Sequence, residues 1–509
     1  MERRGFSIGL CLLATLGACV PARPRIDGAP AAPPAPSALW PVPPAVKEPP
    51  PPAAVPVAPE ATQALRGDTT DFEGHRLEVD DVVDLALRTN PTTRASWLNA
   101  RAAADAYGSS RGALLPSLDG TISAGRTSAA PGSIASLGTV PGEVGTRNAA
   151  TGTRSQLTTS ATLSYLLFDL GGRSGSIEEA KQRAIAADLT HNATVHDVIL
   201  QVESALFSYL ATRALREAQE VSLQEAIADT AAAAERMHVG VATLAEVLQA
   251  RTQLAQGRLQ LATLQGQEIT TKGNLATAMG LPANARFDVG DVQVSDTVAH
   301  VTASVDSLIN AAIATRPDVA EVRAEAASLA AAVRVARSAG YPALTLSTTT
   351  SSIQSTQVGV SPRNAQLFLG VQIPIFNGFS RQYDTRAARE QYDAGLARLA
   401  STRQQVTGQV FAAYSALTTA NDRVRAARDL LVAAQQSADV ALGRYREGVG
   451  TIVDLLLARS ALATARAEDI QARWEWRTAL AQLAHDTGLF TTTGRTQLPL
   501  SNASSNEQR

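Results

Sequence analysis

The 509-residue sequence is poor in aromatic side chains, which make up 4% of it, and in charged side chains, which make up 18%. A large compact core normally holds more large apolar residues, so an alanine-rich chain of this kind indicates long helices packed closely side by side. Basic residues do not outnumber acidic ones, and the formal net charge is -2. Without a basic surplus to neutralise phosphates, nucleic acid is not an expected partner.

Cysteine is almost absent, with only Cys11 and Cys19 in the chain. Residues 5–16 form an apolar run that is too short to span a bilayer and follows a charged start, which is typical of a signal peptide over 1–18. The next residues, Leu16-Gly17-Ala18-Cys19, resemble a bacterial lipobox, in which the cysteine becomes the lipidated first residue. The alternative is an ordinary signal peptide with an incidental cysteine. Either way, we expect no cysteine metal site in the mature chain.

Proline is scarce except near the N-terminus, where residues 21–59 hold 15 of the 25 prolines. Such a segment is extended or disordered, so we interpret residues 19–76 as a lipid anchor followed by a proline-rich spacer. No later run of 18 apolar residues occurs, and we therefore expect no transmembrane helix.

Motifs for catalysis are also missing. The six histidines are scattered without an HExxH pattern, and Gly171-Gly172-Arg173 lacks the lysine and spacing of a phosphate loop. No serine, histidine and aspartate spacing stands out. We therefore expect no catalytic residues, no metal, no cofactor and no enzymatic activity.

What the chain does contain is an internal duplication. Matching residues lie 226 apart in the early part of each copy, as in Asn90-Pro91 and Arg316-Pro317. Later matches lie 208 apart, as in Gly240-Val241 and Gly448-Val449. The spacing changes once, so the first copy has an 18-residue longer loop. Constant offsets on both sides of one insertion indicate two copies of one structural unit.

Each copy has the same predicted layout. A helix interrupted at the proline step precedes two alternating, Ser/Thr-rich segments that read as a β-hairpin, and a proline-free stretch of 66 residues follows. A glycine turn and a return helix complete the copy. The first repeat is predicted over 77–282, with strands about 117–128 and 156–168 and a long helix about 173–238. A linker over 283–302 leads to the second repeat over 303–489, with strands about 343–355 and 365–376 and a long helix about 381–446. A polar tail over 490–509 ends the chain.

The number of strands bears on assembly. Four strands cannot close a barrel, and an open sheet in lipid would leave unsatisfied backbone groups at its edges. Each long helix would measure roughly 100 Å, too long to lie across a bilayer. Either the strands lie outside lipid, or several chains share one barrel, with eight strands from two chains or twelve from three. In both cases the helices must project away from the membrane.

Over roughly residues 77–489 the chain resembles TolC-like outer membrane factors. The resemblance implies a mainly α fold with a β-barrel portion, in which a homotrimer forms a twelve-stranded outer-membrane barrel and a twelve-helix periplasmic tunnel. It also implies a periplasmic adaptor and an inner-membrane pump as partners, with an RND pump favoured and ABC or MFS pumps possible, and contact with outer membrane lipid. The motifs that carry it are the duplication, the strand-to-helix junctions 167–172 and 374–379, and the turn regions 237–248 and 445–456.

The same resemblance assigns roles at the two turns. Gly240, Val241, Gly448 and Val449 would form the periplasmic tip that docks the adaptor. A purely structural role of the glycines, which permit positive φ at a turn, is compatible with docking.

Gating of the tunnel mouth is expected from Glu246, Asp454 and Tyr445. Threefold symmetry would gather six carboxylates there, and clustered carboxylates attract cations. The alternative for both acids is a helix-start residue favoured by the helix dipole. Tyr445 matches a family residue that helps hold the tip shut through hydrogen bonds. This chain departs from the family at Gly450 and Leu457, where relatives carry a gating arginine or a second acidic ring.

The expected function is therefore a passive outer-membrane exit duct of a tripartite efflux system, anchored by lipid and extending into the periplasm, for small molecules such as drugs or metal ions. Two alternatives remain at this stage. One is the channel of a type I protein secretion system, and the other is a lipid-anchored periplasmic coiled-coil scaffold or adaptor.

Overall fold

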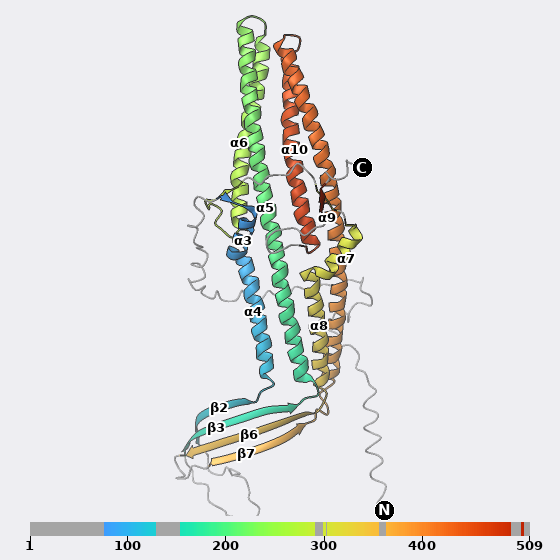
Figure 1. Cartoon of the computed structure of the whole chain (residues 1–509). Helices are drawn as coiled ribbons and strands as arrows, with labels where there is room; N and C mark the ends of the chain where they lie inside the picture. The colour runs from blue at the N-terminus through green and yellow to red at the C-terminus, as the bar shows by residue number, and fades with distance from the viewer. Residues whose placement is uncertain are drawn as a thin grey trace, which may run out of the picture. The chain divides into compact units, whose positions relative to one another are not determined.

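The computed structural model describes residues 76–128, 153–290, 299–301, 303–355, 363–489 and 500–502. The expected signal peptide, Cys19 and the proline-rich spacer lie outside these residues. The chain is mainly α-helical with a smaller β portion, as the sequence predicts (Figure 1). No helix of the described part combines the length and the apolar character needed to cross a membrane.

Two compact units divide the chain, and each takes residues from both sequence repeats. The first, here called the strand unit, contains Ala104–Arg183 and Ala326–Gly395. The second, the helix unit, contains Ala184–Glu325, Leu396–Arg509 and the residues before Ala104 that the structure describes. The compact units thus differ from the predicted repeats, because elements of the two repeats pack on each other as well as within one repeat.

The helix unit is built from two helical hairpins. The first hairpin joins the long helix α5 (Gly172–His238), which begins in the strand unit, to α6 (Leu244–Ala278). The second hairpin joins α9 (Ser380–Arg446) to α10 (Ile452–Asp486) in the same way (Figure 1).

Two short helices complete the duplicated pattern in the helix unit. They are α3 (Val79–Thr89) and α7 (Val305–Thr315), and each is followed at a proline by α4 (Pro91–Gly112) or α8 (Pro317–Ser338). The break lies where the sequence predicts one, because the residue before a proline is pushed out of the helical region. Asn90 and Arg316, the residues in question, have extended ψ angles of 122° and 130°.

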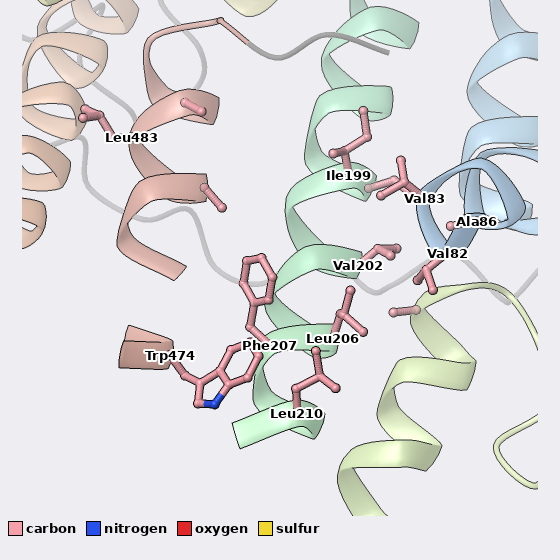
Figure 2. Packing of buried hydrophobic residues seen from close by; sticks show 14 of the residues in the cluster. Val82, Val83, Ala86, Ile199, Val202, Leu206, Phe207, Leu210, Trp474 and Leu483 are labelled. Atoms are coloured by element: carbon pink, nitrogen blue, oxygen red, sulfur yellow. The ribbon is translucent and has the colours of Figure 1, made fainter. Parts of the chain in front are cut away.

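One apolar core holds these helices together. Val82, Val83 and Ala86 of α3 face Ile199, Val202 and Leu206 of α5 (Figure 2). Phe207 of α5 lies beside Trp474 of α10, with ring centroids 6.0 Å apart. The two hairpins therefore share a core at this level, which we call the central core.

The strand unit contains a four-stranded antiparallel sheet with the order β2-β3-β6-β7. The strands are β2 (Ser117–Ser128), β3 (Thr153–Phe168), β6 (Ala343–Ser355) and β7 (Arg363–Gln372). The central pair, β3 with β6, joins the two repeats. β7 ends four residues before the predicted 376, because Pro374 has no backbone N–H to donate to a neighbouring strand.

The register of the sheet gives it two chemically different faces. Directly paired residues point to the same side, so the pairs Leu118–Leu163, Tyr165–Leu346 and Leu346–Leu369 lie on one face. The opposite face also holds Leu166, Ile353 and Phe368, but most of its side chains are hydroxyls and amides, including Thr121, Ser123, Thr158, Ser160, Thr162, Ser164, Thr345, Ser347, Thr349, Ser351 and Gln366. On the apolar face Leu118 is 71% and Leu369 66% exposed, whereas Leu163, Tyr165 and Leu346 of the central strands are half-buried. This face also carries Thr159 and Thr348.

The corners between strands and long helices use the same backbone conformation in both repeats. Leu170 and Gly171 have φ of 52° and 102°, and Gly378 and Phe379 have φ of 66° and 68°. Each corner thus needs two consecutive left-handed residues, and glycine occupies the second place in one repeat and the first in the other. A single glycine in either place is enough for the turn.

Two small sheets of the helix unit have no counterpart in the sequence prediction. β1 (Arg76–Leu77) pairs in parallel with β4 (Asp288–Val289), and β5 (Ala299–Val301) pairs antiparallel with β8 (Leu500–Asn502). Parts of the predicted linker and of the predicted tail are therefore strands. Segments of two or three residues are too short to show an alternating pattern.

Glu203 is a buried acid of α5, 4% exposed, beside the central core residue Val202. Burial, with a smaller contribution from the charge of Asp80, raises the pKa of Glu203 to about 7. The folded state then holds a proton that the unfolded state releases near pH 4.5, so stability is lost as pH rises from there through 7.

We therefore expect Glu203→Gln to stabilise the protein by about 2 kcal/mol at alkaline pH and to change little at acidic pH. Chemical denaturation of both proteins across this range measures the difference. If the unfolding free energy of the wild type did not fall relative to that of Glu203→Gln as the pH rises, the raised pKa of Glu203 would be contradicted.

Candidate functional site

The candidate site is the pair of turns that close the hairpins, here called the first tip (237–243) and the second tip (445–451). Gly240 has φ of 80° and Gly448 of 76°. At the first tip, Val241 N–H donates to the Arg236 carbonyl and Gly240 N–H to the Met237 carbonyl. At the second tip, Val449 N–H donates to the Arg444 carbonyl and Gly448 N–H to the Tyr445 carbonyl. Both turns are Schellman motifs, which require a left-handed residue at the glycine position.

Both return helices begin with a capping box. Glu246 accepts a hydrogen bond from Thr243 N–H at 3.1 Å, and Thr243 Oγ1 accepts one from Glu246 N–H at 3.4 Å. Asp454 and Thr451 make the same pair of bonds at 3.2 Å each. The hydrogen bonds from Thr451 lower the pKa of Asp454. Both carboxylates predicted to gate the tunnel mouth thus have a local partner at a helix start, which a Thr-x-x-acid spacing signals.

Apolar packing joins the two tips to each other. The buried cluster consists of Ala233, Val247, Ala250, Tyr445, Ile452 and Leu455, which come from all four helices of the two hairpins. Tyr445 is 3% exposed and is the largest side chain of this cluster.

An arginine that the sequence interpretation did not single out lies against Tyr445. The guanidinium of Arg236 is 4.7 Å from the centre of the Tyr445 ring, and its Nη1 donates to the Tyr445 carbonyl at 3.1 Å. Arg236 belongs to α5 and Tyr445 to α9, so this contact connects the two hairpins. No short motif marks an arginine over an aromatic ring from another repeat, and only the folded chain shows it.

The phenol of Tyr445 is the group that the sequence predicts to hold the tip shut through hydrogen bonds. Its Oη is buried and has no hydrogen-bond partner among the described residues. Burial raises the pKa of this phenol, although Arg236 acts in the other direction. The ring, rather than the hydroxyl, makes the contacts of Tyr445 within the chain.

We accordingly expect Tyr445→Phe to change the stability of the protein by less than about 0.5 kcal/mol, because no hydrogen bond within the chain is lost. Tyr445→Ala should cost about 3 kcal/mol, since it empties the centre of the tip cluster. Thermal unfolding of the purified protein compares the two variants. Equal losses for Phe and Ala would show that the hydroxyl, and not the ring, is what stabilises the tips.

The outer surface of both tips is apolar. Val241 is 62% and Val449 69% exposed, and neighbouring exposed side chains include Val239, Leu244 and Leu457. Gly450 is confined, because a Cβ there would lie 3.0 Å from Arg444 Cβ and 3.2 Å from its carbonyl carbon. An arginine at this position would require the second tip to shift.

The site therefore offers exposed apolar side chains on a rigid double turn, with two capped carboxylates beside them. Within the described residues, no group of three or more His, Cys, Asp or Glu side chains is placed to hold a metal ion. The arrangement suits a docking surface for another protein.

Comparison with known proteins agrees with the fold and the duplication. The family model described as outer membrane efflux protein matches residues 82–281 and 308–489. Protein CyaE of Bordetella pertussis is 28% identical over 413 residues, which cover 79% of this chain and 82% of that protein. The toluene efflux pump outer membrane protein TtgC of Pseudomonas putida is 25% identical, with 82% and 83% covered.

Solved structures show the same fold. The crystal structure of the outer membrane protein VceC from Vibrio cholerae superposes with a TM-score of 0.68 at 18% identity, covering 81% of this chain and 96% of that one. The chain belongs to the outer membrane efflux protein family, the TolC-like outer membrane factors.

Proposed function

We propose that this protein is the outer-membrane exit duct of a tripartite efflux system and passively conducts small molecules from an inner-membrane pump to the exterior. The observation that carries the proposal is the sheet of the strand unit, which has exposed leucines on one face and many hydroxyl groups on the other. A sheet with these two faces suits a barrel wall between lipid and a water-filled lumen.

The edges of the sheet support a homotrimer. β2 and β7 are the two edge strands, and neither pairs with a further strand among the described residues. Lipid does not tolerate open sheet edges, so β7 of one copy would pair with β2 of the next. Three copies would supply twelve strands, a number within the range of membrane barrels, and the same symmetry would gather their long helices into a twelve-helix periplasmic tunnel.

The tips are the proposed docking surface for a periplasmic adaptor. Gly240 and Gly448 shape the turns, and Val241 and Val449 present apolar side chains to a partner. Glu246, Asp454 and Tyr445 lie at the same turns and would border the tunnel mouth in a trimer. Their gating role remains a proposal, to which the structure adds that both carboxylates also cap helices.

The remaining assignments complete the proposal. The predicted lipobox at Cys19 would anchor the chain to the outer membrane, and residues 19–76 would be the spacer before the two repeats, 77–282 and 303–489. The pump would be an RND transporter by preference. Small-molecule cargo is favoured over protein cargo because two relatives are named for toluene efflux and for pyoverdine export.

A periplasmic scaffold is the competing proposal, and oligomeric structure separates the two. Protein purified from outer membranes in mild detergent should form threefold particles with a short barrel and a long helical tube. Deletion of 343–376, which removes β6 and β7, should abolish membrane insertion. A monomer or dimer without a barrel, or a deletion variant that still inserts, would overturn the duct.

A further inference from the structure

The apolar face of the sheet carries arginine at one end only. This end, here called the far end, is where β2 and β6 finish and β3 and β7 begin, whereas the chain joins helices at the other end (Figure 1). Arg126 of β2 and Arg363 of β7 lie at the far end, and both are exposed. Side chains alternate along a strand, so Arg126 shares the face of Leu118 and Arg363 shares the face of Leu369.

No acidic residue of the sheet shares this face with the two arginines. The only acid in the four strands is Asp119, which pairs with Thr162 and so belongs to the opposite, hydroxyl-rich face. Tyr165 marks the end of the apolar face that lies near the helices. The apolar face is therefore polarised, with an aromatic side chain at one end and uncompensated positive charge at the other.

A hollow beside Arg126 combines polar and apolar side chains. Its volume is about 590 Å³, and five of its lining residues belong to the apolar face, namely Ala124, Arg126, Ser155, Leu157 and Gln354. Arg126 and Ser155 are paired at the far end, and the paired residues Ala124 and Leu157 lie next to them on the side of the helices. A molecule seated there would meet a guanidinium first and a leucine behind it.

The spacing along the strands fits the apolar layer of a membrane. Arg126 comes eight residues after Leu118, and Arg363 comes eight residues before Val371, which is roughly 26 Å along each strand. With the usual tilt of barrel strands this length spans about 20 Å of a lipid-facing band that is about 25 Å tall. Both arginines therefore reach the border of the band, where a guanidinium meets lipid headgroups rather than acyl chains.

The proposed trimer would bring the two arginines to one place. β7 of one copy would pair with β2 of the next, and the alternating direction of the strands makes that pairing antiparallel. Arg363 of one copy and Arg126 of the next would then lie on neighbouring strands, at the same end and on the same face. The far end would point to the outer leaflet, because the proposed duct extends its helices into the periplasm.

We propose that Arg363 of one copy and Arg126 of the next bind the phosphate groups of a phosphorylated glycolipid of the outer leaflet, the lipid A part of lipopolysaccharide. The inference rests on the proposed duct and names the lipid that its outer rim would hold. Guanidinium groups bind phosphate through two parallel hydrogen bonds, and the acyl chains of the same lipid would lie along the leucines of the apolar face. A zwitterionic lipid fits less well, since its own ammonium already neutralises its phosphate.

Lipid binding to the purified full-length protein in mild detergent tests the site. Native mass spectrometry counts bound bisphosphorylated lipid A, with fully dephosphorylated lipid A as the comparison. We expect up to three molecules on each threefold particle and about tenfold or more tighter binding of the phosphorylated form. Arg126→Gln combined with Arg363→Gln should remove this preference. Arg126→Lys with Arg363→Lys should keep part of it, because lysine retains the charge without the fork.

The matched control is Arg154→Gln, which removes the same charge at the same end of the sheet. Arg154 pairs with Thr127 and so belongs to the hydroxyl-rich face, and the preference for phosphate should stay at the wild-type level. A double Gln variant that keeps the wild-type preference would overturn the lipid site. An equal loss of preference in Arg154→Gln would also overturn it.

Inorganic phosphate separates a lipid site from a simple anion site. At the same concentration as lipid A it should displace little of the bound lipid, because it lacks acyl chains, and full displacement would overturn the proposal. Failure of the duct gives a different result, since even the wild type would then form no threefold particle. Failure of the lipid site alone would leave threefold particles that bind both forms of lipid A equally.

Discussion

Gly280→Ala should destabilise the protein by about 3 kcal/mol or more, because the new methyl group meets backbone that cannot rotate away. A Cβ on Gly280 would lie 2.8 Å from Asn90 Cα and from the Thr89 carbonyl oxygen, and 2.9 Å from Asn90 N. The residue also has φ of 79° at the end of α6, a conformation that costs a non-glycine residue about 1 kcal/mol. Chemical denaturation or thermal melting of the purified protein measures the loss.

Two other glycines separate the steric cost from the conformational cost. Gly240 has nearly the same φ, 80°, but nothing lies within 4 Å of a Cβ there, so Gly240→Ala should cost only about 1 kcal/mol. At Gly488 the nearest atom is the Thr315 hydroxyl at 3.0 Å, which can turn aside, and an intermediate loss is expected. Equal losses at Gly240 and Gly280 would refute the close approach of α6 to the α3–α4 break.

Arg316→Ala is the second substitution for which we expect a large effect, a loss of about 3 to 5 kcal/mol. Arg316 is 7% exposed and donates to both carboxylate oxygens of Asp318 at 3.0 and 2.7 Å and to the Asp486 carbonyl at 3.1 Å. Its removal leaves Asp486, which is 5% exposed, without that neighbouring positive charge. Arg316→Lys should recover little, because an ammonium cannot make the forked pair with Asp318.

The first repeat supplies the control for this prediction. There Asn90 stands in place of Arg316 and donates to the Ala278 carbonyl at 3.0 Å, with no carboxylates in the equivalent positions. The triple variant Arg316→Asn, Asp318→Thr and Asp486→Ala copies that arrangement and should regain most of the stability lost in Arg316→Ala. The contact between the α7–α8 break and the end of α10 is here called the joint. A triple variant as unstable as Arg316→Ala would mean that the joint needs the charges themselves and not only their pairing.

His485 belongs to the same joint. Its Nδ1 lies 2.9 Å from Asp486 Oδ1 and its Nε2 lies 2.9 Å from Asp197 Oδ1. Carboxylates only accept, so both ring nitrogens must carry a proton. Burial lowers the pKa of His485, but the hydrogen bonds that the ring donates to Asp197 and Asp486 outweigh it and raise the pKa to about 9. The joint therefore contains a positively charged imidazolium at neutral pH, which binds α10 to α5.

Local sequence patterns were sufficient for the long helices and the four strands of the larger sheet, but not for the two small sheets. The alternation over 117–128 predicts a strand where β2 lies, and the proline-free runs predict helices where α5 and α9 lie. Pro91 and Pro317 mark the helix breaks, and Gly240 and Gly448 mark the tips. These features depend on the conformational preferences of single residues and on periods of a few residues, both of which can be read without knowing the partners of the chain.

Contacts between the repeats needed the folded chain. The pairing of β3 with β6, the position of Arg236 over Tyr445 and the ion pair of Arg459 with Asp229 each join residues far apart in sequence. The duplication tells which positions are equivalent, but equivalent positions diverge, as Asn90 and Arg316 do, and only packing decides which acid meets which base. Glu246 and Asp454 show most directly what a sequence pattern cannot decide. A carboxylate that caps a helix and one that gates a channel can occupy the same sequence pattern and differ only in what surrounds them.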